Sequence, residues 1–265
     1  MSDSAEVRRA AVEARRGEAI TLDALSGQWS ILQRKKGHRH STDDVLTAWY
    51  ALQHGPRVSE TLDLGTGIGT VGLLTLHGLG PAAHLHCVEA QEVSYELLLE
   101  NIALNGLEDR VHPRHGDLRD LHLGRTFDLV TGSPPYFDVS AGVLPPDSQK
   151  AHARFELRGT VADYAETAAR HLSDLPEARF VFCFPTPQKV RAFRAIHDHG
   201  FSAVAHRDVV PRANRAPLFS LFACRRGEHP EHEEAPLVVR DDDGQPTAEM
   251  RAVRRGFGFT VPEPA

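Results

Sequence analysis

From residue 59 onward, short apolar runs alternate with glycine turns and with segments whose apolar residues recur every three or four positions. Short apolar runs are typical of buried strands, and the longer period is typical of helices that cover a sheet. The repeat therefore predicts a parallel sheet with helices on both of its faces. The strands predicted in this way cover residues 61–64, 85–88, 111–114, 127–131 and 179–184.

The pattern changes after Gly200. Residues 202–210 and 218–225 form two strand-like runs with no helical segment between them. Strands joined by a short connection pair in antiparallel fashion, so we expect a hairpin at the edge of the sheet. The predicted fold class is therefore α/β, with a seven-stranded, mostly parallel sheet and an antiparallel edge hairpin.

The predicted elements divide the chain into three parts. Residues 1–58 are expected to hold an N-terminal helix, a hairpin over residues 20–33 and a helix over residues 43–52 that Ser41 or Thr42 caps. Residues 59–227 form the predicted core. Residues 228–265 begin with an acidic, proline-containing run, which predicts a linker, and end with a short helix over residues 248–255.

Composition excludes several classes of protein. The net charge of -6 argues against a protein that binds nucleic acid with its whole surface, so any such contact is expected to be local. No run of eighteen apolar residues is present and no apolar run follows Met1, which predicts a cytoplasmic protein without a membrane partner. Cys87, Cys183 and Cys224 lack metal-site spacing, so we expect reduced core thiols and no metal. A monomer is slightly favoured.

A glycine-rich turn follows the first predicted strand of the core. Gly65, Gly67 and Gly69 stand where the chain turns from strand to helix, and glycine lets the backbone approach a ligand closely. With Gly72 the segment also fits the dinucleotide fingerprint, so a nicotinamide cofactor is an alternative. Asp63 would repel a pyrophosphate but can hold the ammonium group of a methionine moiety. We therefore favour S-adenosylmethionine.

Two further acidic residues end neighbouring predicted strands. Glu89 lies about twenty residues past the glycines, where a carboxylate can accept the hydrogens of both ribose hydroxyls. Asp117 follows the third strand and can accept a hydrogen bond from the adenine amine of the cofactor, or it can cap a turn. Because carboxyl ends of parallel strands share one edge, these side chains are expected to meet the glycine turn there.

The fourth predicted strand leads into Ser133-Pro134-Pro135-Tyr136-Phe137. Two prolines fix the turn and point the carbonyls in one direction. The Ser133 oxygen and the Pro134 carbonyl can each accept a hydrogen of an aromatic amine, which localises the nitrogen lone pair. Tyr136 would stack on the ring and orient it for methyl transfer, so orientation carries the catalysis.

Several segments together resemble one known family. The Ser-Pro-Pro-Tyr segment is similar to the [Asn/Asp/Ser]-Pro-Pro-aromatic motif of amino-methyltransferases. Segments 37–44, 88–91, 100–105 and 150–156 resemble the bacterial tRNA(Val) adenine-N6 methyltransferases, and the likeness runs from about residue 20 to the C-terminus. The sheet that ends in an antiparallel hairpin is likewise similar to Rossmann-like class I methyltransferases, an analogy of fold.

This resemblance implies methylation of N6 of adenine 37 in tRNA, with S-adenosyl-L-homocysteine as the second product. It also implies that Thr42 and Asp43 close over the cofactor, although both also suit a helix start. The family usually has Asn where this chain has Ser133, whose hydroxyl can accept an amine hydrogen but can also donate. Methylation of a protein glutamine amide or a small-molecule amine, and RNA binding without catalysis, are the alternatives.

Basic residues cluster in three segments that flank the predicted carboxyl edge. We expect tRNA phosphates to be bound there, with the base splayed out of an unpaired loop. Together with Tyr136 and Phe137, we expect Arg39, Lys150 and Arg154 to contact the substrate. The three segments contain Arg34, Lys35, Lys36, His38, Arg39 and His40; Lys150, His152, Arg154 and Arg158; and Arg207, Arg212 and Arg215.

Overall fold

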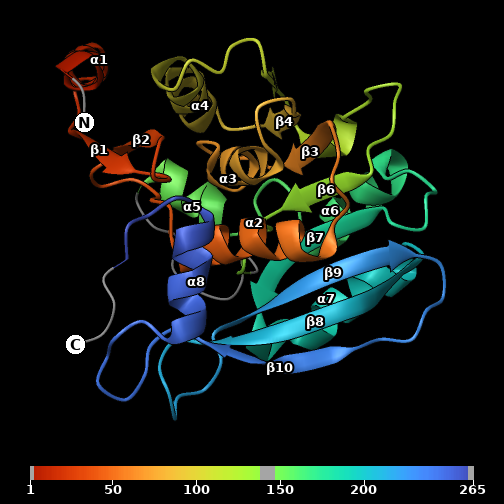
Figure 1. Cartoon of the computed structure of the whole chain (residues 1–265). Coiled ribbons are helices and arrows are strands. Elements are labelled where there is room, and N and C mark those ends of the chain that lie inside the picture. Colours follow the sequence, from red (N-terminus) through yellow and green to blue (C-terminus); the bar gives the residue numbers. More distant parts are fainter. Residues whose placement is uncertain (1–2, 138–146, 262–265) are drawn as a thin grey trace.

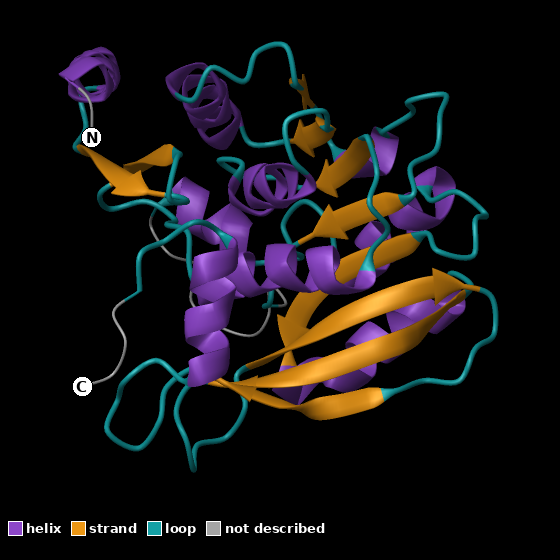
Figure 2. Ribbon diagram, viewed as in Figure 1, coloured by secondary structure: helices purple, strands orange, loops and turns teal. Residues whose placement is uncertain are grey.

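The computed structural model, which describes residues 3–137 and 147–261, contains an eight-stranded sheet and a separate two-stranded hairpin (Figure 1). Helices lie on both sides of the large sheet (Figure 2). The strands are β1 (Ile20–Ala24), β2 (Ser30–Arg34), β3 (Glu60–Leu64), β4 (His84–Glu89), β5 (Val111–His115), β6 (Leu129–Gly132), β7 (Arg179–Pro185), β8 (Phe201–Val210), β9 (Phe219–Arg226) and β10 (Glu233–Val238). The helices are α1 (Asp3–Arg16), α2 (Thr42–His54), α3 (Thr70–Leu79), α4 (Glu92–Leu104), α5 (Ser148–Arg154), α6 (Val161–His171), α7 (Lys189–Asp198) and α8 (Ala248–Gly256), with single 3-10 turns η1 (Leu118–Asp120) and η2 (Thr186–Gln188).

The large sheet has the order β10-β8-β9-β7-β6-β3-β4-β5. Its pairs are parallel except for those that β9 makes with β7 and β8. This confirms the predicted α/β class and the antiparallel hairpin. Because β3 lies between β4 and β6, the strand order reverses at β3, and the carboxyl ends at such a reversal are where open sheets of this kind bind ligands.

The sheet has one strand more than the seven predicted. β10 lies inside the segment that we predicted as a linker, so for that stretch the prediction was wrong. It pairs in parallel with β8 and covers an edge that would otherwise expose a long row of backbone groups. Leu237 is its buried residue among acidic neighbours and Pro236, which explains why its apolar pattern is weak.

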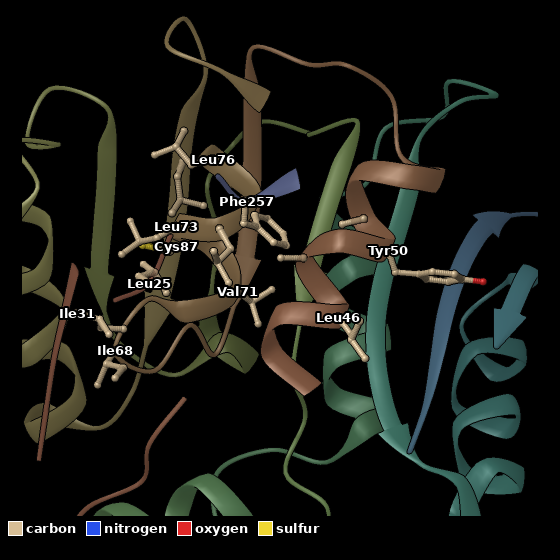
Figure 3. Packing of buried hydrophobic residues seen from close by; sticks show 14 of the residues in the cluster. Leu25, Ile31, Leu46, Tyr50, Ile68, Val71, Leu73, Leu76, Cys87 and Phe257 are labelled. Carbon is tan, nitrogen blue, oxygen red and sulfur yellow. The ribbon is translucent and has the colours of Figure 1, made fainter. Parts of the chain in front are cut away.

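Two layers of apolar side chains fill the space on the two faces of the sheet. One cluster gathers residues of α2, α3 and α4, part of which Figure 3 shows around Leu46, Ile68 and Val71. The other lies beneath α6 and α7. Strand β7 contributes to both clusters because its side chains alternate: Cys183 points to the α2 face, whereas Phe184 points to the opposite one.

The two terminal segments pack on the α2 face. Val12 of α1 and Phe257 after α8 are both 1% exposed in the same cluster as the α2 side chains. The amide of Gly27, in the β1–β2 turn, donates to the Phe257 carbonyl over 2.8 Å. Among the described residues, no helix combines the length and the apolar character needed to cross a membrane.

Candidate active site

A cavity of about 790 Å³ opens at the carboxyl edge of the sheet. Its volume lies in the range of pockets that enclose a cofactor-sized molecule. The walls come from the loops after β3, β4 and β6 and from the start of α2, so residues far apart in the sequence meet there. The segments that line it include 41–44, 65–68, 88–91 and 133–137.

The loop after β3 forms one wall of the cavity and depends on two glycines for different reasons. Gly65 and Gly67 have φ of 60° and 59°, a region that L side chains seldom adopt. A Cβ on Gly65 would lie 1.9 Å from the Tyr164 hydroxyl, so Gly65 is required by packing. A Cβ on Gly67 would meet nothing within 4 Å. Gly67 therefore leaves open space on the cavity side of the loop.

Asp63, at the end of β3, holds this loop in place. Its Oδ2 accepts from the Thr66 hydroxyl over 2.6 Å and its Oδ1 accepts from the Thr131 hydroxyl over 2.7 Å. The side chain is 1% exposed, and burial raises its pKa. Much of the hydrogen-bonding capacity of this carboxyl is therefore used within the protein, although it also borders the cavity.

Glu89, at the end of β4, joins the glycine loop to the next loop. Its Oε2 accepts from the Gly67 amide over 2.8 Å and its Oε1 accepts from the Gln91 amide over 2.7 Å. Burial raises the pKa of this carboxyl, and the two amides lower it in part. Each carboxylate oxygen has a second lone pair. Glu89 can therefore still accept hydrogens from a ligand in the cavity.

The start of α2 brings two more carboxyl groups to the cavity. Ser41 is the N-cap of α2, and its amide donates to Asp44 Oδ2 over 3.1 Å. Asp44 is 8% exposed, and burial together with the nearby Asp43 raises its pKa well above the ordinary value. Asp63 raises the pKa of Asp44 further, so this wall gathers carboxyl groups that a cationic ligand group would stabilise in their ionised form.

Asp44→Asn is expected to stabilise the protein more at pH 8 than at pH 5. Between the unfolded and the raised folded pKa of Asp44, the folded chain binds a proton that the unfolded chain has released, so stability falls as pH rises. The loss amounts to at most about 1.4 kcal/mol per pH unit, and Asn keeps the oxygen that accepts from Ser41. Urea unfolding of both proteins measures the difference. An equal gap at both pH values would contradict it, and exposed Asp109→Asn is the matched control.

The loop after β6 forms the opposite wall. The Tyr136 hydroxyl donates to Asp43 Oδ2 over 2.8 Å, and its ring meets Phe184 edge-on with centroids 6.2 Å apart. Gln188 Nε2 donates to the Tyr136 carbonyl over 2.9 Å. Phe137 is 38% exposed at the cavity, and its ring lies 5.6 Å from that of Phe155. Tyr136 is thus anchored, and Phe137 presents the more accessible aromatic face.

Part of the chain that lines the cavity matches a known protein family. Residues 49–144 match the family model of the methyltransferase small domain. This part of the chain is therefore similar to a methyltransferase domain. The match spans the glycine loop, Glu89 and the Ser133–Tyr136 segment, so the residues that line most of the cavity lie inside the family domain.

Curated relatives extend the likeness over most of the chain. The tRNA1(Val) (adenine(37)-N6)-methyltransferase of Dickeya chrysanthemi is 28% identical, with 88% of this chain and 93% of that protein covered. The protein of the same name from Actinobacillus pleuropneumoniae serotype 7 is 24% identical, with 87% and 94% covered. The resemblance inferred from the sequence is therefore confirmed.

Solved structures agree on the fold. A predicted O-methyltransferase from Agrobacterium tumefaciens superposes with a TM-score of 0.63 at 17% identity, covering 81% of this chain and 96% of that one. TYW2 of Pyrococcus horikoshii in complex with MeSAdo gives 0.54 at 15% identity, covering 79% and 72%. At these identities the likeness concerns the fold, and it confirms the predicted Rossmann-like class I arrangement.

Four residues predicted to bind cofactor or substrate do not line the cavity: Gly69, Asp117, Arg39 and Lys150. Gly69 is the N-cap of α3, and a Cβ there would lie 2.8 Å from Leu98 Cδ1, so packing requires this glycine. Asp117 caps η1, and its carboxylate forms an ion pair with Arg119 at 2.6 Å. Arg39 donates to Thr21 and pairs with Asp23 at 3.0 Å. Lys150 lies half-buried on α5. The side chain of Arg154, a further predicted contact, lies outside the described residues.

The three basic segments differ in how much charge they leave for a ligand. Arg34 pairs with Glu18 and Asp147, and Arg207 pairs with Glu249. Lys35 and Lys36 are exposed in the turn after β2, and the structure gives neither an ion pair within its described residues. Two other arginines donate to backbone carbonyls, Arg212 to that of Asp242 and Arg158 to that of Ala90. Arg215 is exposed.

Some residues that line the cavity were not predicted. Tyr164 of α6 and Gln188 of η2 line it, and Tyr164 closes the glycine loop from behind. Neither belongs to a motif, and each reaches the cavity through the packing of a helix on the sheet. Cys87, Cys183 and Cys224 are free and buried, which confirms the predicted core thiols. Among the described residues, no group of three or more potential ligands has metal-site geometry.

Proposed function

We propose that the protein transfers a methyl group from S-adenosylmethionine to the exocyclic N6 of adenine in tRNA, at position 37 beside the anticodon. One observation carries this proposal: the glycine loop and the Ser133–Phe137 loop open into the same cavity. The curated relatives, which match over most of their length, are named for this reaction. S-adenosyl-L-homocysteine would be the second product. A cytoplasmic location follows from such a substrate.

The cavity residues fit the cofactor. The open face of Gly67 admits a ligand close to the backbone, and the spare lone pairs of Glu89 suit the two ribose hydroxyls. The carboxyl groups of Asp43, Asp44 and Asp63 line the cavity, where they would attract the positively charged ammonium and sulfonium groups of the cofactor. When bound, S-adenosylmethionine supplies the electrophilic methyl group. No metal is required for that chemistry.

The loop after β6 prepares the amine. The Ser133 hydroxyl oxygen and the Pro134 carbonyl each accept one amine hydrogen, which directs the nitrogen lone pair away from the ring. Phe137 and Tyr136 orient the base, so the rate gain comes from alignment. The new nitrogen–carbon bond forms as the sulfur–carbon bond breaks, and the extra proton of the amine leaves to solvent. No strong base is needed.

The tRNA would meet the protein at the mouth of the cavity. Lys35 and Lys36 would contact phosphates next to α5, which carries Lys150 and His152 and whose Gln149 accepts from the His38 amide. A base splayed out of an unpaired loop can enter the cavity, as RNA enzymes that modify bases require. Local contacts of this kind are compatible with a net charge of -6, because the chain need not bind nucleic acid elsewhere.

Labelled S-adenosylmethionine offered together with unmodified tRNA, total protein and small amines tests the proposal. We expect the label in tRNA. Label in a protein glutamine or in a small amine would instead support the alternative acceptors. Tight tRNA binding without any transfer would indicate a binding module that has lost catalysis.

A further inference from the structure

Beneath Ser133, side chains from three elements form a connected polar chain. Ser133 Oγ lies 3.5 Å from Cys183 Sγ on β7, and the Tyr136 hydroxyl oxygen lies 3.3 Å from the same sulfur. The Thr47 hydroxyl, on α2, also lies close enough to Cys183 to lower the pKa of its thiol in part. Cys183 is 0% exposed, whereas Ser133 borders the cavity. Cys183 therefore lies between the Ser133–Phe137 loop and α2, on the buried side of that loop.

The hydrogens of this chain can be assigned by counting donors. A tyrosine or threonine hydroxyl has one hydrogen to donate. That of Tyr136 goes to Asp43 Oδ2 over 2.8 Å, and that of Thr47 goes to the Asp43 carbonyl over 2.7 Å. Toward the sulfur, the Tyr136 and Thr47 oxygens can therefore act only as hydrogen-bond acceptors. Either atom of each sulfur contact could be the donor, but a thiol hydrogen directed to Tyr136 or Thr47 leaves the fewest lone pairs facing one another.

The remaining contact of the sulfur is with Ser133. With the thiol hydrogen directed to Tyr136 or Thr47, the sulfur can act only as an acceptor toward Ser133, so Ser133 donates its hydrogen to Cys183. Burial raises the pKa of the thiol to about 12, so it keeps its hydrogen at neutral pH. Ser133 Oγ then turns lone pairs, rather than its hydrogen, toward the cavity.

We propose that Cys183 is a positioning residue that fixes the Ser133 hydroxyl as an acceptor for the substrate amine. The inference rests on the proposed function. A hydroxyl that donated into the cavity would bind the nitrogen lone pair and suppress its attack on the methyl group. An asparagine carbonyl needs no such orientation because it carries no hydrogen. The contacts from Asp43 through Tyr136 and Cys183 to Ser133 thus explain how serine can accept the amine hydrogen. The family that this chain resembles usually has asparagine at that position.

A double-mutant cycle tests the proposal. Cys183→Ala is measured in the native background and in a Ser133→Asn background, with kcat on unmodified tRNA and the Kd of S-adenosylmethionine as readouts. In the native background we expect kcat to fall about tenfold, the effect of losing one oriented hydrogen bond, with little change in Kd. In the Ser133→Asn background we expect less than about a twofold change, because the amide oxygen accepts without help. Cys183→Ser, which keeps a donor and an acceptor, should retain near-native kcat.

Equal losses in the two backgrounds would overturn the proposal, because a purely structural role of Cys183 lowers both alike. Thermal unfolding of each variant measures the stability that both backgrounds lose when alanine replaces Cys183. Absence of methyl transfer to tRNA by the native protein would be a different failure, since it would remove the proposed function itself and this role with it.

Discussion

Gly67→Ala is expected to weaken binding of S-adenosylmethionine by about 10-fold to 100-fold. Gly67 has φ of 59° and open space on its cavity side. A methyl group there would occupy the volume into which the cofactor fits. The left-handed conformation would also cost about 1–2 kcal/mol, which disturbs the amide that donates to Glu89. Calorimetric titration measures the affinity.

Gly124→Ala is the matched control for this substitution. Gly124 has φ of 64° and nothing within 4 Å of a Cβ, yet it does not line the cavity. Both variants therefore carry similar backbone strain and should lose similar thermal stability. Gly67→Ala alone should lose cofactor affinity. Equal affinity in the two variants would place the cofactor elsewhere.

Tyr136→Ala is expected to lower kcat on tRNA by about 100-fold or more while the protein still binds S-adenosylmethionine. The ring fills the space against Phe184 and its hydroxyl anchors the loop to Asp43. Without both, Ser133 and Pro134 lose their alignment, and a displacement of about 1 Å at a reacting group can cost 100-fold. Single-turnover methyl transfer measures the chemical step.

Tyr136→Phe separates the ring from the hydroxyl. It keeps the packing against Phe184, and Thr47 remains as an acceptor for the thiol hydrogen of Cys183, so the loss in kcat should stay within about fivefold. Near-native turnover by Tyr136→Ala would show that this loop does not position the amine. A comparable loss in both variants would assign the main role to the hydroxyl.

The core of the fold could be predicted from the sequence because its strands are short apolar runs bounded by glycine turns. Because the carboxyl ends of parallel strands share one edge, the sequence also predicts that the glycine loop, Glu89 and Ser133 lie together. β10 was missed because its pairing depends on the unpaired edge of β8 rather than on its own apolar pattern. Strand pairing is a property of two segments, and one of them alone carries little signal.

The orientation of polar side chains was harder to predict. Asp63 is predicted to face the cofactor, but no motif indicates that the Thr66 and Thr131 hydroxyls donate to its carboxylate. Cys183 was assigned to the core, which is correct, but its contact with Ser133 follows from the register that pairs Gly132 with Phe182. Such contacts depend on a one-residue choice of register, which decides the face that each side chain reaches.

The central claim is methyl transfer to N6 of adenine 37. The most direct measurement uses an unmodified tRNA(Val) transcript and the same transcript with guanine at position 37, each incubated with labelled S-adenosylmethionine and digested to nucleosides. We expect labelled N6-methyladenosine from the first transcript and no label from the second. Equal labelling of both transcripts, or label in a nucleoside other than N6-methyladenosine, would contradict the account.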